Sequence, residues 1–293
     1  FVKKFEEKFK INVKRKYAVS VSNGTAALEI AVRALNIGSG DEVIMPTFTI
    51  ISCAGAVIKA GAKPVLVDSE LTTWNMDVNQ IEKKITKKTK AIMVVHIYGL
   101  PVDLDPILEI AKKYNLKIIE DSAEMHGQKY KGNPCGSFGD LSVFSFYPNK
   151  HITTGEGGMI VTDNKSLEAR CKSLRNLCFK KGRRFVHDEL GWNYRFTNLQ
   201  AAVGLAQLEN LHIHIQKKKE MGKLYGKLFS NIDQIQLPLP KTEYAENIFW
   251  VFGVLLKENA SINSAEIMKI LAKKGIGTRP FFYPMHKQPV FNK

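Results

Sequence analysis

Short apolar segments rich in β-branched residues alternate with amphipathic stretches of helical length in the first half of the chain. Strands that pair in parallel need a long crossover connection, which is usually a helix. Continuous apolar character is typical of strands that helices cover on both faces. The predicted strand segments are YAVSVS (17–22), EVIMP (42–46), PVLVD (64–68), AIMVVHIYG (91–99) and LKIIEDSAE (116–124). The sequence therefore predicts an α/β fold with a mostly parallel sheet wound by helices.

Helix boundaries are marked by glycine and by capping residues. Gly38 and Gly61 occupy positions expected for C-caps, and Asp103 and Ser264 occupy positions expected for N-caps. The amphipathic stretch DVNQIEKKI (77–85), which follows the third strand segment, is also predicted to be helical.

The second half of the chain changes character near residue 231. Before it, the predicted elements are strands in LSVFSFY (141–147) and GMIVTD (158–163), a helix around 166–174 and a long helical region from Asn198 into the 220s. After it come a strand in IFWVFGVLL (248–256), a helix in 264–275 and a strand in IGTRPFF (276–282). We therefore predict a large domain over residues 1–230 and a smaller α/β domain over 231–293, which we expect to be incomplete.

Composition points to a globular protein of the cytoplasm. The chain has 293 residues, of which 44% are hydrophobic, and no apolar run approaches the length that spans a bilayer. The four cysteines have neither metal-ligand nor disulfide-framework spacing, so we expect reduced thiols. His212 and His214 lack carboxylate or cysteine partners at ligand spacing, so no metal site is predicted.

The net charge of +15 raises the question of an anionic partner. The lysines are spread over solvated helices such as 83–90 and 214–227 and are not interleaved with stacking aromatic residues. This pattern disfavours nucleic acid. A diffuse positive field also attracts small polyanions, of which a nucleotide sugar is one.

Two stretches with polar residues fall at the ends of predicted parallel strands, where ligands of wound sheets bind. SNGTAAL (22–28) leads through Gly24 and Thr25 into a helix whose first N–H groups are free to bind an anion, although an ordinary turn with an N-cap has the same sequence. Asp121 ends a very apolar strand, where a carboxylate is costly unless a positive group is near. A structural ion pair and a ligand contact are both open for Asp121.

Lys150 stands in a third such stretch, FSFYPNKHITTGEGGMIV (144–161). A lysine in an apolar mouth has a lowered pKa and becomes a nucleophilic amine, whereas a lysine in a surface loop does not. The neighbouring glycines allow close backbone approach, and Ser145 offers a hydroxyl on the preceding strand. An anion cradle, a buried carboxylate and an amine at one sheet edge are what pyridoxal phosphate requires.

Five segments together resemble the DegT/DnrJ/EryC1/StrS family of sugar aminotransferases. They are SNGTAALEIAVRALNIGSGDEVIMPTFTI (22–50), KAIMVVHIYG (90–99), IIEDSAE (118–124), GSFGDLSVFSFYPNKHITTGEGGMIVT (136–162) and GWNYRFTNLQAAVGLAQLE (191–209). The resemblance covers nearly the whole chain in the expected order. It implies fold type I of the pyridoxal-phosphate enzymes, with a seven-stranded sheet, and a homodimer with active sites at the subunit interface.

The resemblance also implies roles for particular residues. Lys150 is the expected Schiff-base lysine, and Ile50 stands where relatives usually carry an aromatic residue that stacks on the pyridine ring. Without an aromatic ring this position loses about 0.5–1.5 kcal/mol of stacking. The other expected cofactor contacts are Gly24, Thr25 and Ser145 to the phosphate, Asp121 to the pyridine nitrogen and Glu124 beside the ring.

Three further positions follow from the resemblance. Asn193 matches an asparagine that reaches the cofactor phosphate from the neighbouring subunit, and Arg195 follows it as a candidate substrate contact. A loop capped by Thr197 explains this stretch equally well. His286, in YPMHKQP (283–289), is a candidate contact to the sugar or an ordinary loop histidine.

The implied reaction moves the amino group of L-glutamate to the C4 keto group of a nucleotide-linked 4-keto-6-deoxyhexose. Three alternatives remain: amination at C3 or on a UDP- or dTDP-linked sugar by the same chemistry, a sugar dehydratase, and a non-enzymatic regulator. The dehydratases of this superfamily carry histidine in place of the lysine, so Lys150 favours transamination. The sequence has no helix-turn-helix signature, which disfavours a DNA-binding regulator.

Overall fold

A seven-stranded sheet forms the centre of the protein. The computed structural model describes residues 1–180 and 182–291. The strand order is β1-β9-β8-β5-β4-β2-β3, and β9 alone runs antiparallel to its neighbours, which confirms the predicted mostly parallel sheet. The strands are β1 (Tyr17–Val21), β2 (Glu42–Pro46), β3 (Lys63–Val67), β4 (Thr89–Val95), β5 (Lys117–Asp121), β8 (Leu141–Ser145) and β9 (Gly158–Thr162).

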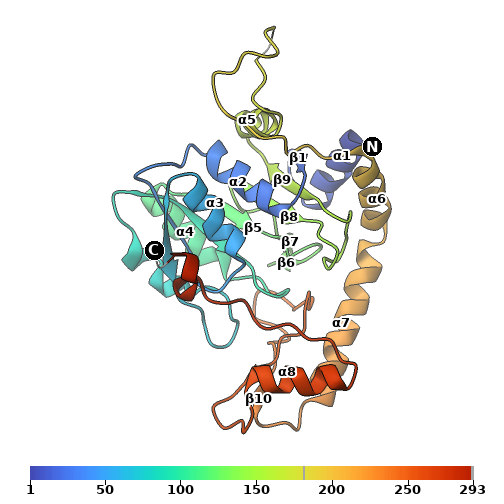
Figure 1. Cartoon of the computed structure of the whole chain (residues 1–293). Helices are drawn as coiled ribbons and strands as arrows, with labels where there is room; N and C mark the ends of the chain where they lie inside the picture. The colour runs from blue at the N-terminus through green and yellow to red at the C-terminus, as the bar shows by residue number, and fades with distance from the viewer. Residues whose placement is uncertain (181, 292–293) are drawn as a thin grey trace.

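Helices cover both faces of this sheet because successive strand residues point to opposite sides. In β4, Met93 belongs to the core under α2, α3 and α5, while its neighbour Ile92 belongs to the core under α4. Helices α1 and α6 lie side by side at one edge of the sheet (Figure 1), and a third core contains side chains from both. The helices are α1 (Val2–Asn12), α2 (Gly24–Ala34), α3 (Ile51–Lys59), α4 (Leu104–Tyr114), α5 (Lys165–Arg175), α6 (Asn198–Glu209) and α7 (Leu211–Leu228).

Helix α1 was not predicted, although the sequence carries a signal for it. Phe5 and Phe9 are four residues apart, so they lie on one helix face, and both are fully buried. Phe5 packs on Phe146 with 5.2 Å between ring centroids, and Phe9 packs on Phe144 with 4.9 Å. The polar residues between the two aromatic side chains obscured this stripe.

The predicted helix over 77–85 is wrong. Two short 3-10 helices, η1 (Val78–Gln80) and η2 (Glu82–Lys84), occupy this segment. Asp77 accepts hydrogen bonds from the backbone N–H of Asn79 at 3.0 Å and from the side chain of Gln80 at 3.0 Å. Such local bonds compete with a continuous helix.

One of the four predicted helix caps is confirmed: Asp103 is the N-cap of α4. Gly61 is displaced by one residue, because the C-cap of α3 is Ala60 and Gly61 follows it with a left-handed φ of 86°. Gly38 is not a C-cap because α2 ends at Ala34, and Ser264 is the first residue of a helix whose N-cap is Asn263. Thr197 caps α6 with a complete capping box.

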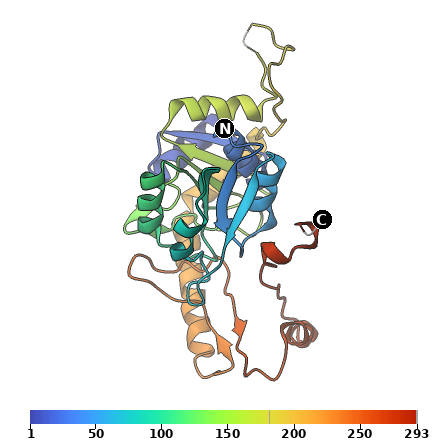
Figure 2. The same cartoon turned by 90° about the vertical axis from the view of Figure 1, so that its left-hand side faces the viewer.

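The region after α7 forms a small lobe whose last part returns to the sheet (Figures 1 and 2). Its core helix is α8 (Ser264–Lys273), and Met285, beyond it, is buried in the core of the sheet domain. The division at residues 230 and 231 stays a prediction. The remaining short elements are β6 (Lys129–Tyr130), β7 (Asn133–Pro134), β10 (Ile235–Gln236), β11 (Leu255–Leu256), η3 (Met285–Lys287) and η4 (Pro289–Phe291).

The predicted strands over 248–256 and 276–282 are wrong except at Leu255–Leu256. Residues 248–250 turn around Gly99, where Phe249 adopts a left-handed φ of 49°. Phe281 packs against Tyr98 with 5.4 Å between ring centroids. Residues 248–250 are buried and Phe281 is half-buried, whereas Leu255 and Ile276 are exposed. An apolar run of this length does not by itself distinguish a strand from a loop.

None of the helices in the described ranges combines the length and apolar character that crossing a bilayer requires.

The packing of α1 on the sheet is testable by truncating Phe9. We expect Phe9→Ala to lower the free energy of unfolding by about 3–5 kcal/mol, because it opens a cavity in a closed aromatic core. Ile11→Ala is the matched control on the same helix: Ile11 is 71% exposed, so its change should stay within about 0.5 kcal/mol. Urea denaturation measures both. Equal effects would show that α1 does not hold the core.

Candidate active site

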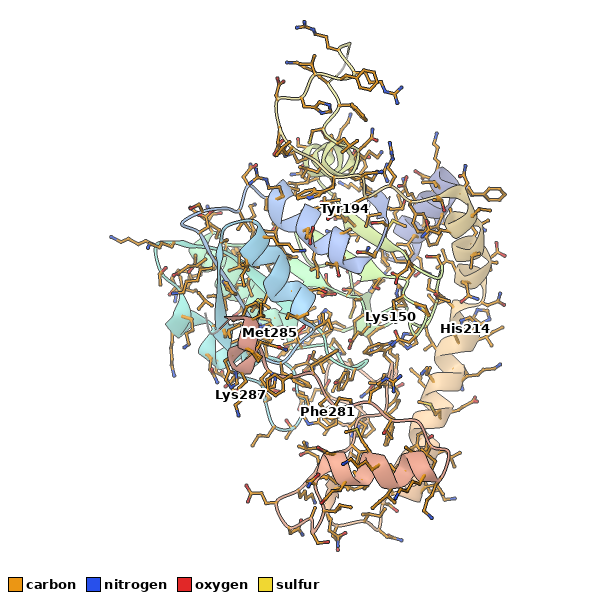
Figure 3. The ribbon with its side chains drawn as sticks, in the orientation of Figure 1. Lys150, Tyr194, His214, Phe281, Met285 and Lys287 are labelled. Carbon is orange, nitrogen blue, oxygen red and sulfur yellow. The ribbon has the colours of Figure 1, made fainter. Side chains whose placement is uncertain are left out.

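A cavity of about 620 Å³ lies at the carboxyl ends of the parallel strands, where the sheet faces the C-terminal segments. Lys150 lies at this junction (Figure 3). The cavity gathers seven predicted site residues, which are Gly24, Thr25, Ile50, Asp121, Glu124, Ser145 and Lys150. These residues come together because of the topology: the start of α2 and the carboxyl ends of β5 and β8 lie at the same edge of the sheet.

Lys150 is a buried amine whose charge has little solvent to stabilise it. Its side chain is 10% exposed, and its Nζ lies 3.6 Å from the centre of the Trp250 ring and 3.9 Å from Glu124 Oε1. Burial lowers the pKa of Lys150, while the charges of Glu124 and Asp121 act to raise it. This environment favours a lysine that exchanges a proton readily.

The backbone around Lys150 explains the glycine-rich sequence that follows it. The Lys150 N–H donates to Tyr147 O at 3.0 Å, and a turn through Gly155, with φ of 78°, brings the chain back to the strand. A Cβ on Gly157 would lie 2.4 Å from Thr154 Oγ1 and 2.7 Å from a Phe196 ring atom. Only glycine fits there, so this residue holds the loop that presents the lysine.

Asp121 ends β5 and points into the cavity with 3% exposure. One oxygen accepts from the Ala123 N–H at 3.0 Å, and the other accepts from the Cys53 thiol at 3.3 Å. Burial raises the pKa of Asp121, and these two bonds and the charge of Lys150 offset it only in part. A buried carboxylate of this kind gains stability from a further positive group.

Glu124 is a second buried carboxylate near Lys150. Its Oε2 accepts from the Tyr98 N–H at 2.6 Å. Burial raises the pKa of Glu124 to about 7, against the opposing charge of Lys150. Glu124 and Lys150 therefore form a buried pair that holds a proton near neutral pH.

The start of α2 forms an anion cradle. The Asn23 side chain accepts from the Ala26 N–H at 2.8 Å, and the Asn23 carbonyl accepts from Ala27. The N–H groups of Gly24 and Thr25, at the first two helical positions, have no acceptor within the helix. A Cβ on Gly24 would lie 2.9 Å from Ser145 Cβ, so glycine lets the helix start approach Ser145.

Three predicted residues do not line this cavity. Asn193 and Arg195 are exposed, and Arg195 donates to the Asn176 side chain at 3.0 Å. His286 Nδ1 and the Thr47 hydroxyl form a hydrogen bond of 2.7 Å, and neither residue lines the cavity. The functional roles of Asn193, Arg195 and His286 therefore remain predictions.

Several lining residues were not predicted. Tyr194 lies between Asn193 and Arg195, lines the cavity and donates to Glu29 at 2.8 Å. Trp250 covers Lys150 from a segment more than 90 residues away in the chain, inside an apolar run that indicated a strand. Cys53 does not itself line the cavity but donates to Asp121, which does, and it stands at an ordinary position in α3. No local pattern identifies the last two.

Three potential metal ligands lie close together beside the cavity, and two of them are already hydrogen-bonded to each other. His96, Glu120 and Cys135 have ligand atoms within 4.8 Å of one another. Burial acts to raise the pKa of Glu120, but hydrogen bonds from His96 and from backbone N–H groups lower it to about 2. His96 and Glu120 thus belong to an internal hydrogen-bond network, while burial raises the pKa of the Cys135 thiol and favours its neutral form.

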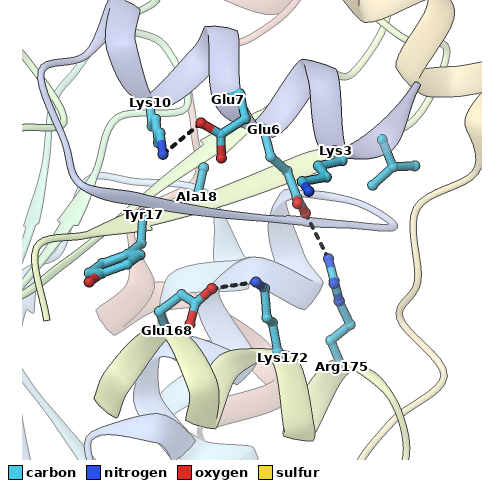
Figure 4. A pocket seen from close by; sticks show the side chains of 10 residues that line it. Lys3, Glu6, Glu7, Lys10, Tyr17, Ala18, Glu168, Lys172 and Arg175 are labelled. Carbon is cyan, nitrogen blue, oxygen red and sulfur yellow. Dashed lines mark hydrogen bonds and ion pairs between the residues drawn. The ribbon is translucent and has the colours of Figure 1, made fainter. Parts of the chain in front are cut away.

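A second cavity, of about 380 Å³, lies at the β1 edge of the sheet between α1 and α5 (Figure 4). Six of its seven charged side chains form ion pairs, one of which joins Arg175 and Glu6 at 3.0 Å. The backbone of Ser20 is also satisfied there, by the same two side chains. We assign this cavity to packing of the sheet edge.

The larger cavity thus fits pyridoxal phosphate on its own chemistry. Free N–H donors at a helix start suit a phosphate, a buried carboxylate suits a protonated pyridine nitrogen, and a buried amine suits an aldehyde. The wound sheet and these residues define a pyridoxal-phosphate enzyme of fold type I.

Comparisons with known proteins agree with this class. A family model described as the DegT/DnrJ/EryC1/StrS aminotransferase family matches residues 1–293. The chain is 45% identical to GDP-perosamine synthase of Escherichia coli O157:H7, over 100% of this chain and 79% of that protein, and 42% identical to GDP-perosamine synthase of Caulobacter vibrioides, over 99% and 78%. The Streptococcus pneumoniae protein Spr1654 in its PLP form superposes with a TM-score of 0.92 at 28% identity, over 99% of this chain and 79% of that one.

The chain belongs to the DegT/DnrJ/EryC1/StrS aminotransferase family. It is a pyridoxal-phosphate-dependent sugar aminotransferase.

Replacing Glu124 tests the electrostatics of the buried pair. Glu124→Gln removes the charge that raises the pKa of Lys150, so that pKa should fall and more free amine should be present at pH 8. We expect carbamylation of Lys150 by cyanate in the apoprotein to become about tenfold faster at that pH, measured by peptide mass spectrometry. Glu29→Gln is the control, because Glu29 pairs with Lys59. A rate unchanged by Glu124→Gln would contradict the coupling.

Proposed function

We propose that this enzyme transfers the amino group of L-glutamate to the C4 keto group of a GDP-linked 4-keto-6-deoxyhexose. The observation that carries transamination is the buried Lys150 amine, held between Glu124 and the Trp250 ring in the same cavity as Asp121. The relatives named GDP-perosamine synthase support the choice of a GDP-linked sugar.

Lys150 is proposed to handle the proton of the reaction. Bound pyridoxal phosphate supplies an electron sink for the carbon that loses this proton. Nζ takes the proton from Cα of the amino donor and holds it until it is returned. Burial favours the free amine, and the two nearby carboxylates favour the protonated one, so both forms are accessible.

The other residues are proposed to orient the groups that react. Gly24 and Thr25 direct backbone N–H groups at the phosphate, with Ser145 beside them. Asp121 stays ionised opposite a protonated ring nitrogen, and the Cys53 thiol fixes one of its oxygens. Ile50, which is 42% exposed at the N-cap of α3, would cover the ring face at the position where the family resemblance implies an aromatic side chain.

A dTDP- or UDP-linked sugar, or amination at C3, is the second candidate. A relative from Aneurinibacillus thermoaerophilus named dTDP-3-amino-3,6-dideoxy-alpha-D-galactopyranose transaminase is 40% identical, close to the value for the GDP-perosamine synthases. Dehydration is disfavoured because His151 does not take the place of Lys150. His151 is 4% exposed and does not line the cavity.

A substrate panel tests this proposal. We expect pyridoxal-phosphate-loaded enzyme with L-glutamate to aminate a GDP-linked 4-keto-6-deoxyhexose with kcat/KM at least about tenfold above the dTDP- and UDP-linked substrates. Mass spectrometry and NMR identify the product and the aminated carbon. Preference for a dTDP- or UDP-linked sugar, or a C3 amine, would replace the GDP proposal with the second candidate.

The covalent residue is tested separately. Borohydride reduction of the loaded enzyme should label Lys150, and Lys150→Ala should lower kcat by about three orders of magnitude. Lys219→Ala is the matched control, since Lys219 is also half-buried but pairs with Glu246 at 2.9 Å and does not line the cavity. Label on any other residue would remove Lys150 from its proposed role.

We also propose that the enzyme is a homodimer in which Asn193 completes the partner's active site. Asn193 and Arg195 are exposed and lie outside the cavity of their own chain. Helix α3, which begins at the cavity, exposes Ile51 and Ile58 at 41% and 42%. An apolar helix face beside a site that lacks its expected residue fits a second copy.

Mixing two inactive variants tests this arrangement. Lys150→Ala and Asn193→Ala, refolded together, should regain about a quarter of wild-type activity, because half of the dimers are hybrids and each hybrid has one intact site. Either variant alone is the control. If Asn193 served its own chain, no mixture would regain activity. Sedimentation of the mixture reports whether dimers formed.

A further inference from the structure

Trp250 is held rigidly over the catalytic lysine. Its indole N–H donates to Asn149 O at 2.9 Å, and its own carbonyl accepts from Lys218 Nζ at 3.0 Å. Trp250 is 6% exposed. These bonds fix both the ring and the backbone, so the ring face has little freedom to move.

The segment that carries Trp250 is clamped on the turn at Gly99. Ile248 N–H donates to Gly99 O at 3.1 Å, and Gln128 donates to the same carbonyl at 2.6 Å. A Cβ on Gly99 would lie 2.7 Å from the backbone nitrogens of both Phe249 and Trp250. This close approach holds residues 248–250 against the active site.

The ring presents its π face to the reacting atom. Lys150 Nζ lies 3.6 Å from the centre of the Trp250 ring, well within the distance at which an ammonium group is attracted to the ring. Tryptophan gives the strongest contact of this kind, and exclusion of water strengthens it. Glu124 Oε1 lies slightly farther from the amine, at 3.9 Å.

We propose that Lys150 Nζ rests against the face of the Trp250 ring whenever the amine is not covalently bound to the cofactor. We propose further that this contact stabilises the protonated amine while it holds the transferred proton. Trp250 is then a catalytic residue, since it contacts the reacting atom. This inference rests on the proposed role of Lys150. It predicts that loss of the aromatic face weakens proton holding at Nζ, and that a phenyl ring, whose attraction for an ammonium group is weaker than that of an indole, keeps only part of the effect.

Other charged and titratable groups also affect the pKa of the Lys150 amine, so they must be left unchanged in the variants that test Trp250. Glu124 and Asp121 favour its protonated form, and His126, whose pKa burial lowers to about 4, stays neutral near pH 7. The Cys53 thiol is neutral because burial raises its pKa. None of them is altered in the variants below.

Two substitutions separate the ring face from packing. Trp250→Leu keeps an apolar side chain over Nζ but removes the π face, whereas Trp250→Phe keeps a ring and removes the N–H. Phe252→Leu is the matched control, because Phe252 lies two residues on and packs on Tyr225, with 5.1 Å between ring centroids.

The measurement is the rate of cyanate carbamylation of Lys150 in the full-length apoprotein between pH 6 and 10, read by peptide mass spectrometry. Without the π face, more of the amine is free at pH 8, so Trp250→Leu should be labelled about five- to tenfold faster than wild type. Trp250→Phe should fall between them, and Phe252→Leu should match wild type. Near-ultraviolet circular dichroism checks folding.

Three outcomes overturn the proposal: Trp250→Leu labelled at the wild-type rate, Trp250→Phe as fast as Trp250→Leu, or Phe252→Leu as fast as either. If Trp250→Leu does not fold, the comparison of Trp250→Phe with wild type decides: equal rates contradict a π contact. Borohydride labelling of wild type is independent of these rates. Label away from Lys150 refutes the proposed function, while label on Lys150 with unchanged carbamylation refutes only the role of Trp250.

Discussion

The architecture around the active site depends on one buried carboxylate, that of Glu120. It is completely inaccessible to solvent and accepts hydrogen bonds from His96, two serine hydroxyls and the N–H groups of residues 136, 138 and 139. These donors join β4, β5, β8 and the turn before β8. Because a buried charge is tolerated only when its bonds are satisfied, this network fixes the strand ends that surround the cavity.

Glu120 and Asp121 are neighbours on one strand and have opposite environments. Successive strand residues point to opposite faces of the sheet. Glu120 therefore points to one face, where it accepts hydrogen bonds from six groups, and Asp121 points to the other, where it accepts hydrogen bonds only from a backbone N–H and a thiol. The pKa of Glu120 is accordingly lowered and that of Asp121 raised. A well-satisfied charge stabilises the fold, and an under-satisfied one is available to a cofactor.

Much of the fold and site could be predicted because the relevant signals are local. All seven sheet strands coincide with apolar runs, and the seven predicted cavity residues lie within motifs at strand ends. The errors occur where packing between distant segments overrides the local pattern. Residues 248–256 carry a strand-like run but turn around Gly99, and Phe5 and Phe9 form a helix whose apolar stripe is only two side chains wide.

The sequence by itself determined the wound sheet, the cradle at Gly24 and the lysine at the strand end, because periodicity, glycine and capping act over a few residues. Only the tertiary structure decided what surrounds Lys150. Trp250 and Glu124 come from segments about 100 and 26 residues away, and burial between them sets the proton affinity of the amine. That property depends on desolvation and on charges gathered in three dimensions, for which no local sequence pattern exists.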